Sequence, residues 1–313
     1  MPQTLFQKHS KGILSMLLAF FFFGIGNALV KDTTQTYSIS QILSIRSFTI
    51  LLPLLFYIFF IQKKTKPFTV FKTENLKSHF FRGFLVIVSL WCIFAGLGLL
   101  PLANATVLGF TNVLFMSIIS IPFLKEKVSF PQWIAIFIGF SGVLVIARPG
   151  SDLSNFIELG AIFMLIGGLL DGMVLLYPRK MGKKDSVLTI LVYYALFSLF
   201  FGLCLMVFEG WVPIASSEDL LFLVGVGFFS LLGQLFATQA FQYAPAGLLS
   251  PLIYSILIWS ALFGYLIWGE IPDIYTFIGA AILIGSGCYV IYKSPTQATI
   301  TEEIPLSPEG GHG

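Results

Sequence analysis

Three long stretches of the chain carry no charged side chain, and they limit what it can fold into. No Asp, Glu, Lys or Arg occurs in residues 83–124, 186–208 or 220–269. Because a helix needs about 20 apolar residues to cross a bilayer, the first and last stretches each predict two spanning helices. Only 11% of the residues are charged and 57% are hydrophobic, whereas soluble domains carry about 25% charged residues. The chain is therefore expected to be an integral membrane protein.

Polar breaks and Pro or Gly turns divide the chain into apolar segments of spanning length. Pro101 and Pro245 mark turns inside the two longest uncharged stretches. The pattern predicts an all-α membrane protein with ten transmembrane helices. The expected spans are residues 12–31, 40–61, 80–99, 103–124, 131–148, 158–178, 187–208, 219–241, 246–268 and 274–292.

Lys and Arg residues gather between alternate spans, and cytoplasmic loops of membrane proteins carry the excess of these residues. With both termini in the cytoplasm, every basic residue except Lys31, Arg46 and Arg148 falls on the cytoplasmic side, Arg82 included. The pattern predicts a multi-pass protein of a bacterial inner (plasma) membrane with both termini cytoplasmic.

The two halves of the chain match each other, at an offset of 148 residues in the first two helices and 144 in the last three. The matching pairs include Gly24 with Gly172, Lys31 with Arg179, Pro101 with Pro245, and Glu126 with Glu270. Each unit holds an odd number of helices, so the second copy must enter the membrane from the opposite side. Such inverted repeats are typical of secondary transporters, with the substrate near the bilayer midplane.

This repeat sets the expected domain organisation. Residues 12–148 form the first five-helix repeat and residues 158–293 the second, joined by a connecting loop at 149–157. Residues 1–11 are a cytoplasmic N-terminal segment. The tail at 294–313 is polar and rich in Pro and Gly, a composition typical of disorder.

The residues that carry most enzyme chemistry are scattered. The cysteines lie singly in apolar segments, and the histidines lie in terminal or basic loop sequence, with no spacing typical of a metal site or a catalytic triad. They are Cys92, Cys204, Cys288, His9, His79 and His312. No phosphate-binding G-x-x-x-x-G-K-[ST] motif occurs. We therefore expect no enzyme activity, no metal and no cofactor.

Two stretches resemble the drug/metabolite transporter superfamily with two EamA-type repeats. They are "PLANATVLGFTNVLFMSIISIPFLKEKVSFPQWIAIFIGFSGVLVIARPG" and "QAFQYAPAGLLSPLIYSILIWSALFGYLIWGEIPDIYTFIGAAILIGSGCYVIYK". The likeness extends over residues 12–293. It implies a ten-helix secondary transporter that moves a small metabolite by alternating access.

Shorter motifs resemble one branch of that superfamily, which contains bacterial S-adenosylmethionine carriers. The motifs are "ILSIRSF", "FFRGFL", "LANATVLGF" and "WGEIPD". Asn112 departs from the family pattern, because relatives commonly have proline there. The chain thus lacks that source of a helix kink and gains a side-chain amide.

Arg46 and Asp171 are the charges that lie clearly inside predicted spans, and such charges mark functional sites by default. At about 1.5 Å per residue, Arg46 lies roughly 9 Å from the outer end of its helix and Asp171 roughly 10 Å from the inner end of its own. A cation and an anion on either side of the midplane suit a zwitterionic substrate. Alternatively, Arg46 reaches the outer interface and Asp171 makes a buried interhelical hydrogen bond. If Asp171 titrates, it is the candidate for proton coupling.

Other polar and aromatic residues within spans could contact substrate. Amides deep in spans either bind substrate or join helices, and aromatic rings either stack on a cationic or planar group or fill the core. The amide candidates are Asn27, Asn112 and Gln239, and the aromatic candidates are Trp91, Tyr254 and Trp259.

Glu126 and Glu270 occupy the same corner of the two repeats, between the fourth and fifth helices. A carboxylate there can accept hydrogen bonds from the first amides of the next helix or fix the turn. We expect both to build corners, with proton coupling as the alternative.

These features predict a secondary transporter of a small polar, zwitterionic or amino-acid-derived metabolite, with S-adenosylmethionine or amino acids as first candidates. The alternative is a flippase for a lipid-linked substrate, and a remote one is an integral-membrane enzyme. The expected partners are a small-molecule substrate and the lipid bilayer, not nucleic acid; a homodimer stays open, as do the direction of transport and its coupling.

Overall fold

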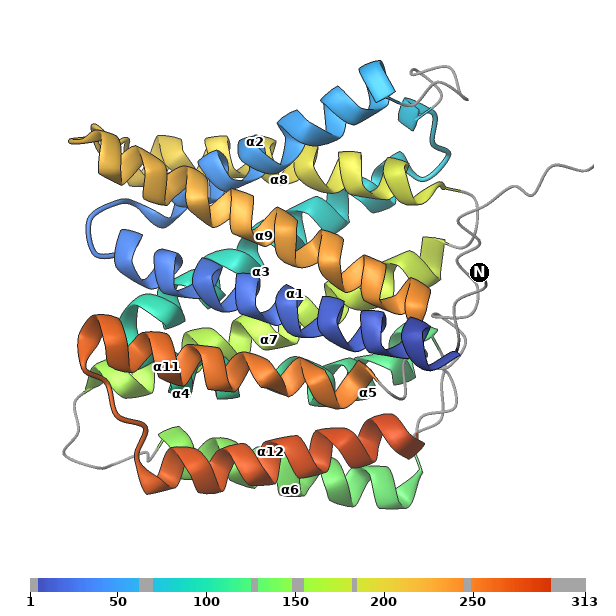
Figure 1. The fold of residues 1–313 in the computed structure, drawn as a ribbon, viewed down its shortest axis with the longest axis vertical. Helices are drawn as coiled ribbons and strands as arrows, with labels where there is room; N and C mark the ends of the chain where they lie inside the picture. Colours follow the sequence, from blue (N-terminus) through green and yellow to red (C-terminus); the bar gives the residue numbers. More distant parts are fainter. Residues whose placement is uncertain are drawn as a thin grey trace, which may run out of the picture.

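The computed structural model describes residues 5–61, 70–124, 129–147, 155–181, 185–244 and 249–293 (Figure 1). Every regular element in these ranges is a helix, which confirms the all-α class. The α-helices are α1 (Leu5–Thr33), α2 (Ile39–Phe56), α3 (Leu76–Leu99), α4 (Leu102–Gly109), α5 (Thr111–Leu124), α6 (Phe130–Ala147), α7 (Asn155–Met181), α8 (Val187–Glu209), α9 (Ser217–Tyr243), α11 (Ile256–Trp268) and α12 (Ile274–Lys293). A π-helical turn at Tyr57–Ile61 extends α2, and a 3-10 turn at Ser250–Ser255 precedes α11.

Apolar helices account for all of the predicted spans. Among the described residues, 7 helical segments are long and apolar enough to cross a membrane, and one of them joins α4 to α5 as Leu102–Pro122. Three shorter apolar helices follow, at Phe130–Ile146, Leu252–Trp268 and Ile274–Tyr289. A ten-span topology therefore requires these three shorter helices to cross the membrane as well.

The outer surface of this bundle is apolar. Phe208, Phe130 and Ile271 expose 87%, 78% and 77% of their surface, and many other large apolar side chains are exposed around them. Soluble proteins rarely expose apolar patches on this scale. Such a surface is stable where lipid chains cover it.

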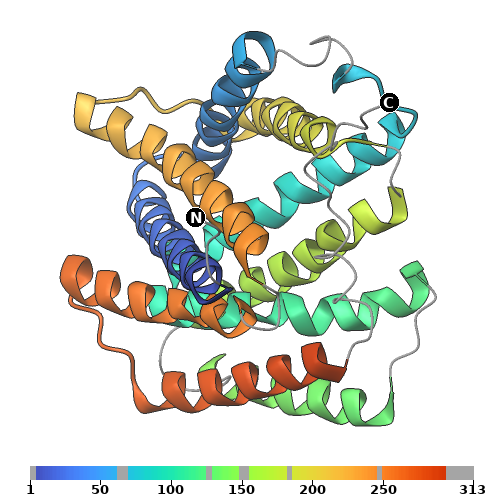
Figure 2. The same ribbon diagram turned by 45° about the vertical axis from the view of Figure 1, so that its right-hand side comes forward.

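Helix packing follows the sequence repeat. α1 packs against α9, and α3 packs against α7. The repeat offsets pair α1 with α7 and α3 with α9, so these two contacts are equivalent. α2 with α8, and α6 with α12, are contacts between equivalent helices; they lie at opposite ends of the molecule (Figures 1 and 2).

The fourth segment of each half is irregular at the same place. Phe110 interrupts the first, between α4 and α5, and Tyr254 lies in the 3-10 turn that precedes α11 in the second. These two residues are related by the 144-residue offset, and their rings meet edge-on with centroids 4.9 Å apart. Residue 112 is asparagine, so the interruption occurs without a proline at that position. The Thr111 hydroxyl stabilises the interruption by donating to the Leu108 carbonyl at 2.7 Å.

Candidate functional site

Asp171 and Asn112, two predicted site residues, are in direct contact inside the bundle. The Asn112 amide Nδ2 on α5 donates to the Asp171 carboxylate Oδ2 on α7 at 2.9 Å. The two helices approach closely because α7 carries Gly172, where a Cβ would lie 3.0 Å from the backbone nitrogen of Met116. This contact agrees with the interhelical hydrogen bond predicted from the sequence as the alternative role of Asp171. It uses Oδ2 and leaves Oδ1 for further partners.

Arg82 is close enough to Asp171 for their charges to interact, and the sequence pattern did not indicate this. The charge pattern placed Arg82 with the cytoplasmic basic residues, but α3 begins at Leu76, so Arg82 lies within the helix, about 9 Å from its start. Its guanidinium Nε and Nη1 are buried without a hydrogen-bond partner. The Tyr194 ring of α8 lies 5.5 Å from Cζ. The uncharged stretch that begins at residue 83 was the signal that could have placed it.

Arg82 and Asp171 attract each other without forming an ion pair. Their charges interact electrostatically. Ion pairs among the described residues include Lys31 with Glu270 and His79 with Asp185, and Arg82 is in neither. A guanidinium and a carboxylate therefore lie near one another inside the bundle with hydrogen-bonding positions still unused.

Arg46 sits in the seam between α2 and α9. Its Nε lies 3.4 Å from the Ser230 hydroxyl, and its Nη1 is buried without a hydrogen-bond partner. Gly26 on α1 faces the same hydroxyl, because a Cβ there would lie 3.9 Å from Ser230 Oγ. The predicted residue Asn27 follows Gly26 and is half-buried.

The helix contact at Arg46 and the helix contact at Arg82 occupy equivalent positions in the two repeats. The 148-residue offset pairs Arg46 with Tyr194, the residue whose ring lies beside Arg82. One seam joins α2 to α9 and the other joins α8 to α3. The fold therefore places two half-buried guanidinium groups at equivalent seams, one beside α2 and the other beside α8.

The other four predicted contact residues have different surroundings. Trp91 donates its indole N–H to the Glu209 carboxylate at the end of α8. Trp259 packs edge-on against Phe21, 4.8 Å between centroids, and its buried indole nitrogen has no hydrogen-bond partner. Tyr254 meets Phe110 at the helix interruption, and Gln239 is exposed on α9.

Glu270 lies at the corner between α11 and α12, with hydrogen-bond partners other than those expected. Its carboxylate accepts from the Leu102 backbone amide at 2.8 Å, which is the start of α4 and not of α12, and it pairs with Lys31. Lys31 also donates to the Leu100 carbonyl at 2.8 Å and lies 5.0 Å from the Trp268 ring. We call these residues the Lys31–Glu270 clamp. Glu126, its predicted counterpart, lies outside the described residues.

His79 is a second correction, because the structure places it in α3 and not in a loop. Its side chain is buried, with Nε2 3.1 Å from Asp185 Oδ2, and Asn75 donates to the same oxygen at 3.0 Å. Burial raises the pKa of Asp185, but hydrogen bonds from Asn75, Thr73 and His79 outweigh this and hold the pKa below its usual value. This cluster joins the beginning of α3 to the turn before α8.

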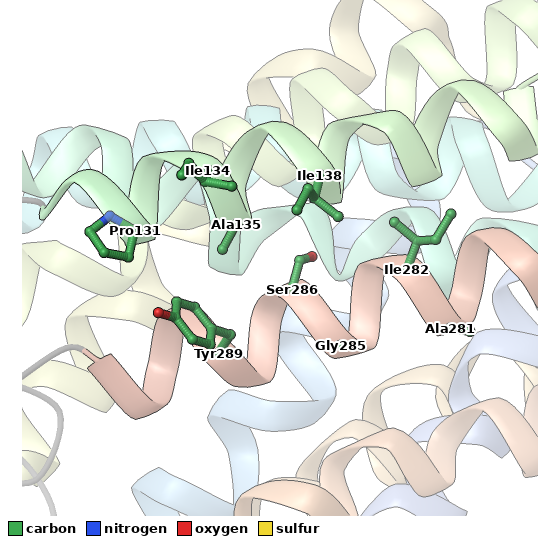
Figure 3. A pocket seen from close by; sticks show the side chains of 9 residues that line it. All are labelled: Pro131, Ile134, Ala135, Ile138, Ala281, Ile282, Gly285, Ser286 and Tyr289. Atoms are coloured by element: carbon green, nitrogen blue, oxygen red, sulfur yellow. The ribbon is translucent and has the colours of Figure 1, made fainter.

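A groove between α6 and α12 has a volume of about 450 Å³ (Figure 3). It is lined by Pro131, Ile134, Ala135, Ile138, Ala281, Ile282, Gly285, Ser286 and Tyr289. No charged side chain is among them, and the two hydroxyl groups are the only polar side-chain atoms. A small polar metabolite would find no ionic partner in this groove.

An apolar helical bundle that buries a few ionisable groups is the architecture of a membrane carrier. The chain belongs to the EamA-like transporter family, which matches residues 10–148 and 158–293. It is thus an integral membrane protein of a transporter family, as the sequence resemblance predicted.

The individual relatives described here share less than 30% sequence identity with this chain. An S-adenosylmethionine uptake transporter of Rickettsia conorii is 29% identical over 76% of this chain and 81% of its own. A pseudopaline exporter of Pseudomonas aeruginosa is 26% identical over 87% of this chain and 93% of its own. One solved crystal structure matches with a TM-score of 0.59 at 15% identity, covering 91% of this chain and 95% of the other. That last likeness supports the fold alone.

Proposed function

We propose that this protein is a secondary transporter that moves a small polar, amino-acid-derived metabolite by alternating access. The observation that carries the proposal is the set of half-buried ionisable groups within the apolar bundle, namely Arg46, Arg82 and Asp171, together with the guanidinium nitrogens that are buried without a hydrogen-bond partner. In the proposed topology, ten helices cross a bacterial inner membrane as two inverted repeats, residues 12–148 and 158–293. The loop 149–157 joins them, and the segments 1–11 and 294–313 lie in the cytoplasm.

Each buried group has a role in this proposal. A guanidinium binds the substrate carboxylate through paired N–H donors, and Asp171 binds the substrate ammonium group. Asn112 holds the Asp171 carboxylate in place through their 2.9 Å hydrogen bond. Asn27, Gln239, Trp91, Tyr254 and Trp259 stay predicted contacts that this arrangement does not require.

Asp171 is also the group we propose for proton coupling. A carboxylate that meets the substrate cation can exchange that cation for a proton, so that each crossing carries one or the other. Substrate movement would then depend on the pH gradient across the membrane.

Uptake into proteoliposomes that contain the purified protein tests the proposal. Labelled S-adenosylmethionine, the substrate in the Rickettsia relative's name, and a panel of amino acids are supplied with and without a pH gradient. We expect uptake of at least one of them by the wild type, and its loss in Asp171→Asn. Glu218→Gln, which removes an exposed carboxylate, is the matched control. The proposal fails if no such compound moves while a lipid-linked sugar crosses the same membrane.

A further inference from the structure

The proposed site holds one more positive charge than a zwitterionic substrate needs. Arg46 and Arg82 contribute two guanidinium groups, and Asp171 contributes one carboxylate. Arginine stays protonated in proteins, so the imbalance is permanent. A guanidinium group with nitrogens buried in an apolar bundle is stabilised by a counter-charge, and a substrate can supply it.

The unused donors show where that counter-charge would bind. Nε and Nη1 of Arg82 are buried without a hydrogen-bond partner, and so is Nη1 of Arg46. Buried polar atoms in native proteins nearly always have partners, so orphaned ones indicate that a partner is missing. Two separate groups of orphaned donors indicate two binding points.

Tyr194 does not satisfy Arg82. Its ring lies 5.5 Å from the guanidinium carbon, and an aromatic ring attracts a cation without accepting its N–H groups in strong hydrogen bonds. The guanidinium donors lie in one plane and match the two oxygens of a carboxylate. An acidic substrate group is therefore the partner that fits Arg82.

The two arginines differ in their relation to Asp171. Arg82 is the charged side chain that acts on Asp171, whereas Arg46 lies in the other seam, against Ser230. In an amino acid the ammonium and carboxylate groups are attached to one carbon. Asp171 with Arg82 therefore suits this pair, and Arg46 is left for a more distant acidic group.

We propose that the substrate carries two acidic groups and one amine, with Arg46 binding the second acid. This inference rests on the proposed function and names the class of substrate as an amino-acid derivative with an acidic side chain. S-adenosylmethionine, with one carboxylate and a sulfonium cation, would leave Arg46 without a counter-charge and should bind more weakly.

Acid and amide pairs of equal size test this assignment. The unfolding temperature of the purified full chain is measured at increasing concentrations of each compound. Its rise gives an affinity for that compound, because a ligand stabilises the state it binds. The pairs are aspartate with asparagine, glutamate with glutamine, and 2-aminoadipate with its side-chain amide. For at least one pair we expect the acid to bind the wild type about tenfold more tightly than the amide, as charge-assisted hydrogen bonds are the stronger kind.

The variants separate the two arginines. Arg46→Gln should remove the preference for the acid while leaving amide affinity near that of the wild type. Arg82→Gln should weaken both members of the pair and keep their ratio. Lys77→Gln, which removes an exposed positive charge near the start of α3, should change neither.

The possible failures are distinguishable. If amino acids bind the wild type but acid and amide bind equally, or if S-adenosylmethionine binds more tightly than every acid, the second acidic group is wrong while the transporter proposal survives. The second acidic group is also wrong if Arg46→Gln keeps the acid preference. If neither S-adenosylmethionine nor any amino acid binds or is taken up, the proposed function fails together with this inference. The wild-type comparison stands even if a variant does not fold.

Discussion

The Lys31–Glu270 clamp and the Arg46, Arg82 and Asp171 cluster both bury charge, but they use it differently. In the clamp, Lys31 meets a carboxylate, a carbonyl and an aromatic ring, and Glu270 also meets a backbone amide. In the cluster, three guanidinium nitrogens have no hydrogen-bond partner. A completed network holds parts of a fold together, whereas an incomplete one is kept at a cost in stability.

Under the proposed function, this difference separates structural charge from charge that binds a substrate. The clamp joins the end of α1, the turn before α4 and the corner after α11, so it connects segments from both halves of the sequence. The cluster lies within the bundle, on the substrate path that we propose. Mutations should therefore lower stability at the clamp and lower transport at the cluster.

Glu270→Ala should have the largest effect on stability. It leaves the Lys31 ammonium buried without its carboxylate and the Leu102 amide without its acceptor, a kind of loss that costs about 3–5 kcal/mol. Thermal unfolding in detergent measures it. Glu218→Ala, at an exposed position, should unfold like the wild type. Equal stability of the two variants would mean that the clamp does not hold the fold.

Asn112→Ala should have an intermediate effect. It removes a hydrogen bond to a charged group, worth about 1.5–3 kcal/mol, and frees the Asp171 carboxylate to turn. We expect a raised KM for uptake together with reduced stability. Ser117→Ala on the same helix, whose hydroxyl donates to the Val113 carbonyl of that helix, is the control. An unchanged KM would remove Asn112 from the site.

Asp185→Asn should cost about 1 kcal/mol, the value of one ordinary hydrogen bond, in a pH-dependent way. Because the folded-state pKa of Asp185 is lowered, its contribution is complete above the unfolded-state value of about 3.9. It is lost as the pH falls from there through the folded-state pKa. The wild type should thus be more stable than the variant at neutral pH, and the gap should shrink below about pH 4 in acid unfolding curves. A gap that stays constant with pH would contradict the assignment.

Sequence patterns predicted the helical segments and several members of the cluster, because both depend on local features. Uncharged runs located the helices, and an isolated charge within such a run pointed to Arg46 and Asp171, as an isolated amide pointed to Asn112, the hydrogen-bond partner of Asp171. Arg82 was missed because its placement depends on where α3 begins, and basic residues near a helix start also fit a cytoplasmic loop.

Long-range partners could not be predicted from the sequence. Glu270 bonds to Leu102, and Trp91 to Glu209, and neither contact leaves a trace in spacing or periodicity. The interruption at Phe110 was likewise hidden, because the chain lacks the proline that would have marked it. His79 and Asp185 meet only because α3 and α8 begin side by side, a consequence of the packing.

The smallest expected effect on stability gives the most direct test of the difference between clamp and cluster. Arg82→Gln removes a half-buried charge whose Nε and Nη1 are buried without a hydrogen-bond partner, so the desolvation cost of these atoms disappears along with the weak ring contact. Stability and uptake of this variant are measured on one preparation, beside Glu270→Gln. We predict unfolding within about 1 kcal/mol of the wild type and uptake reduced at least about tenfold. A variant that unfolds easily, or that transports like the wild type, would show that Arg82 is a structural charge and would contradict the proposed role of the cluster.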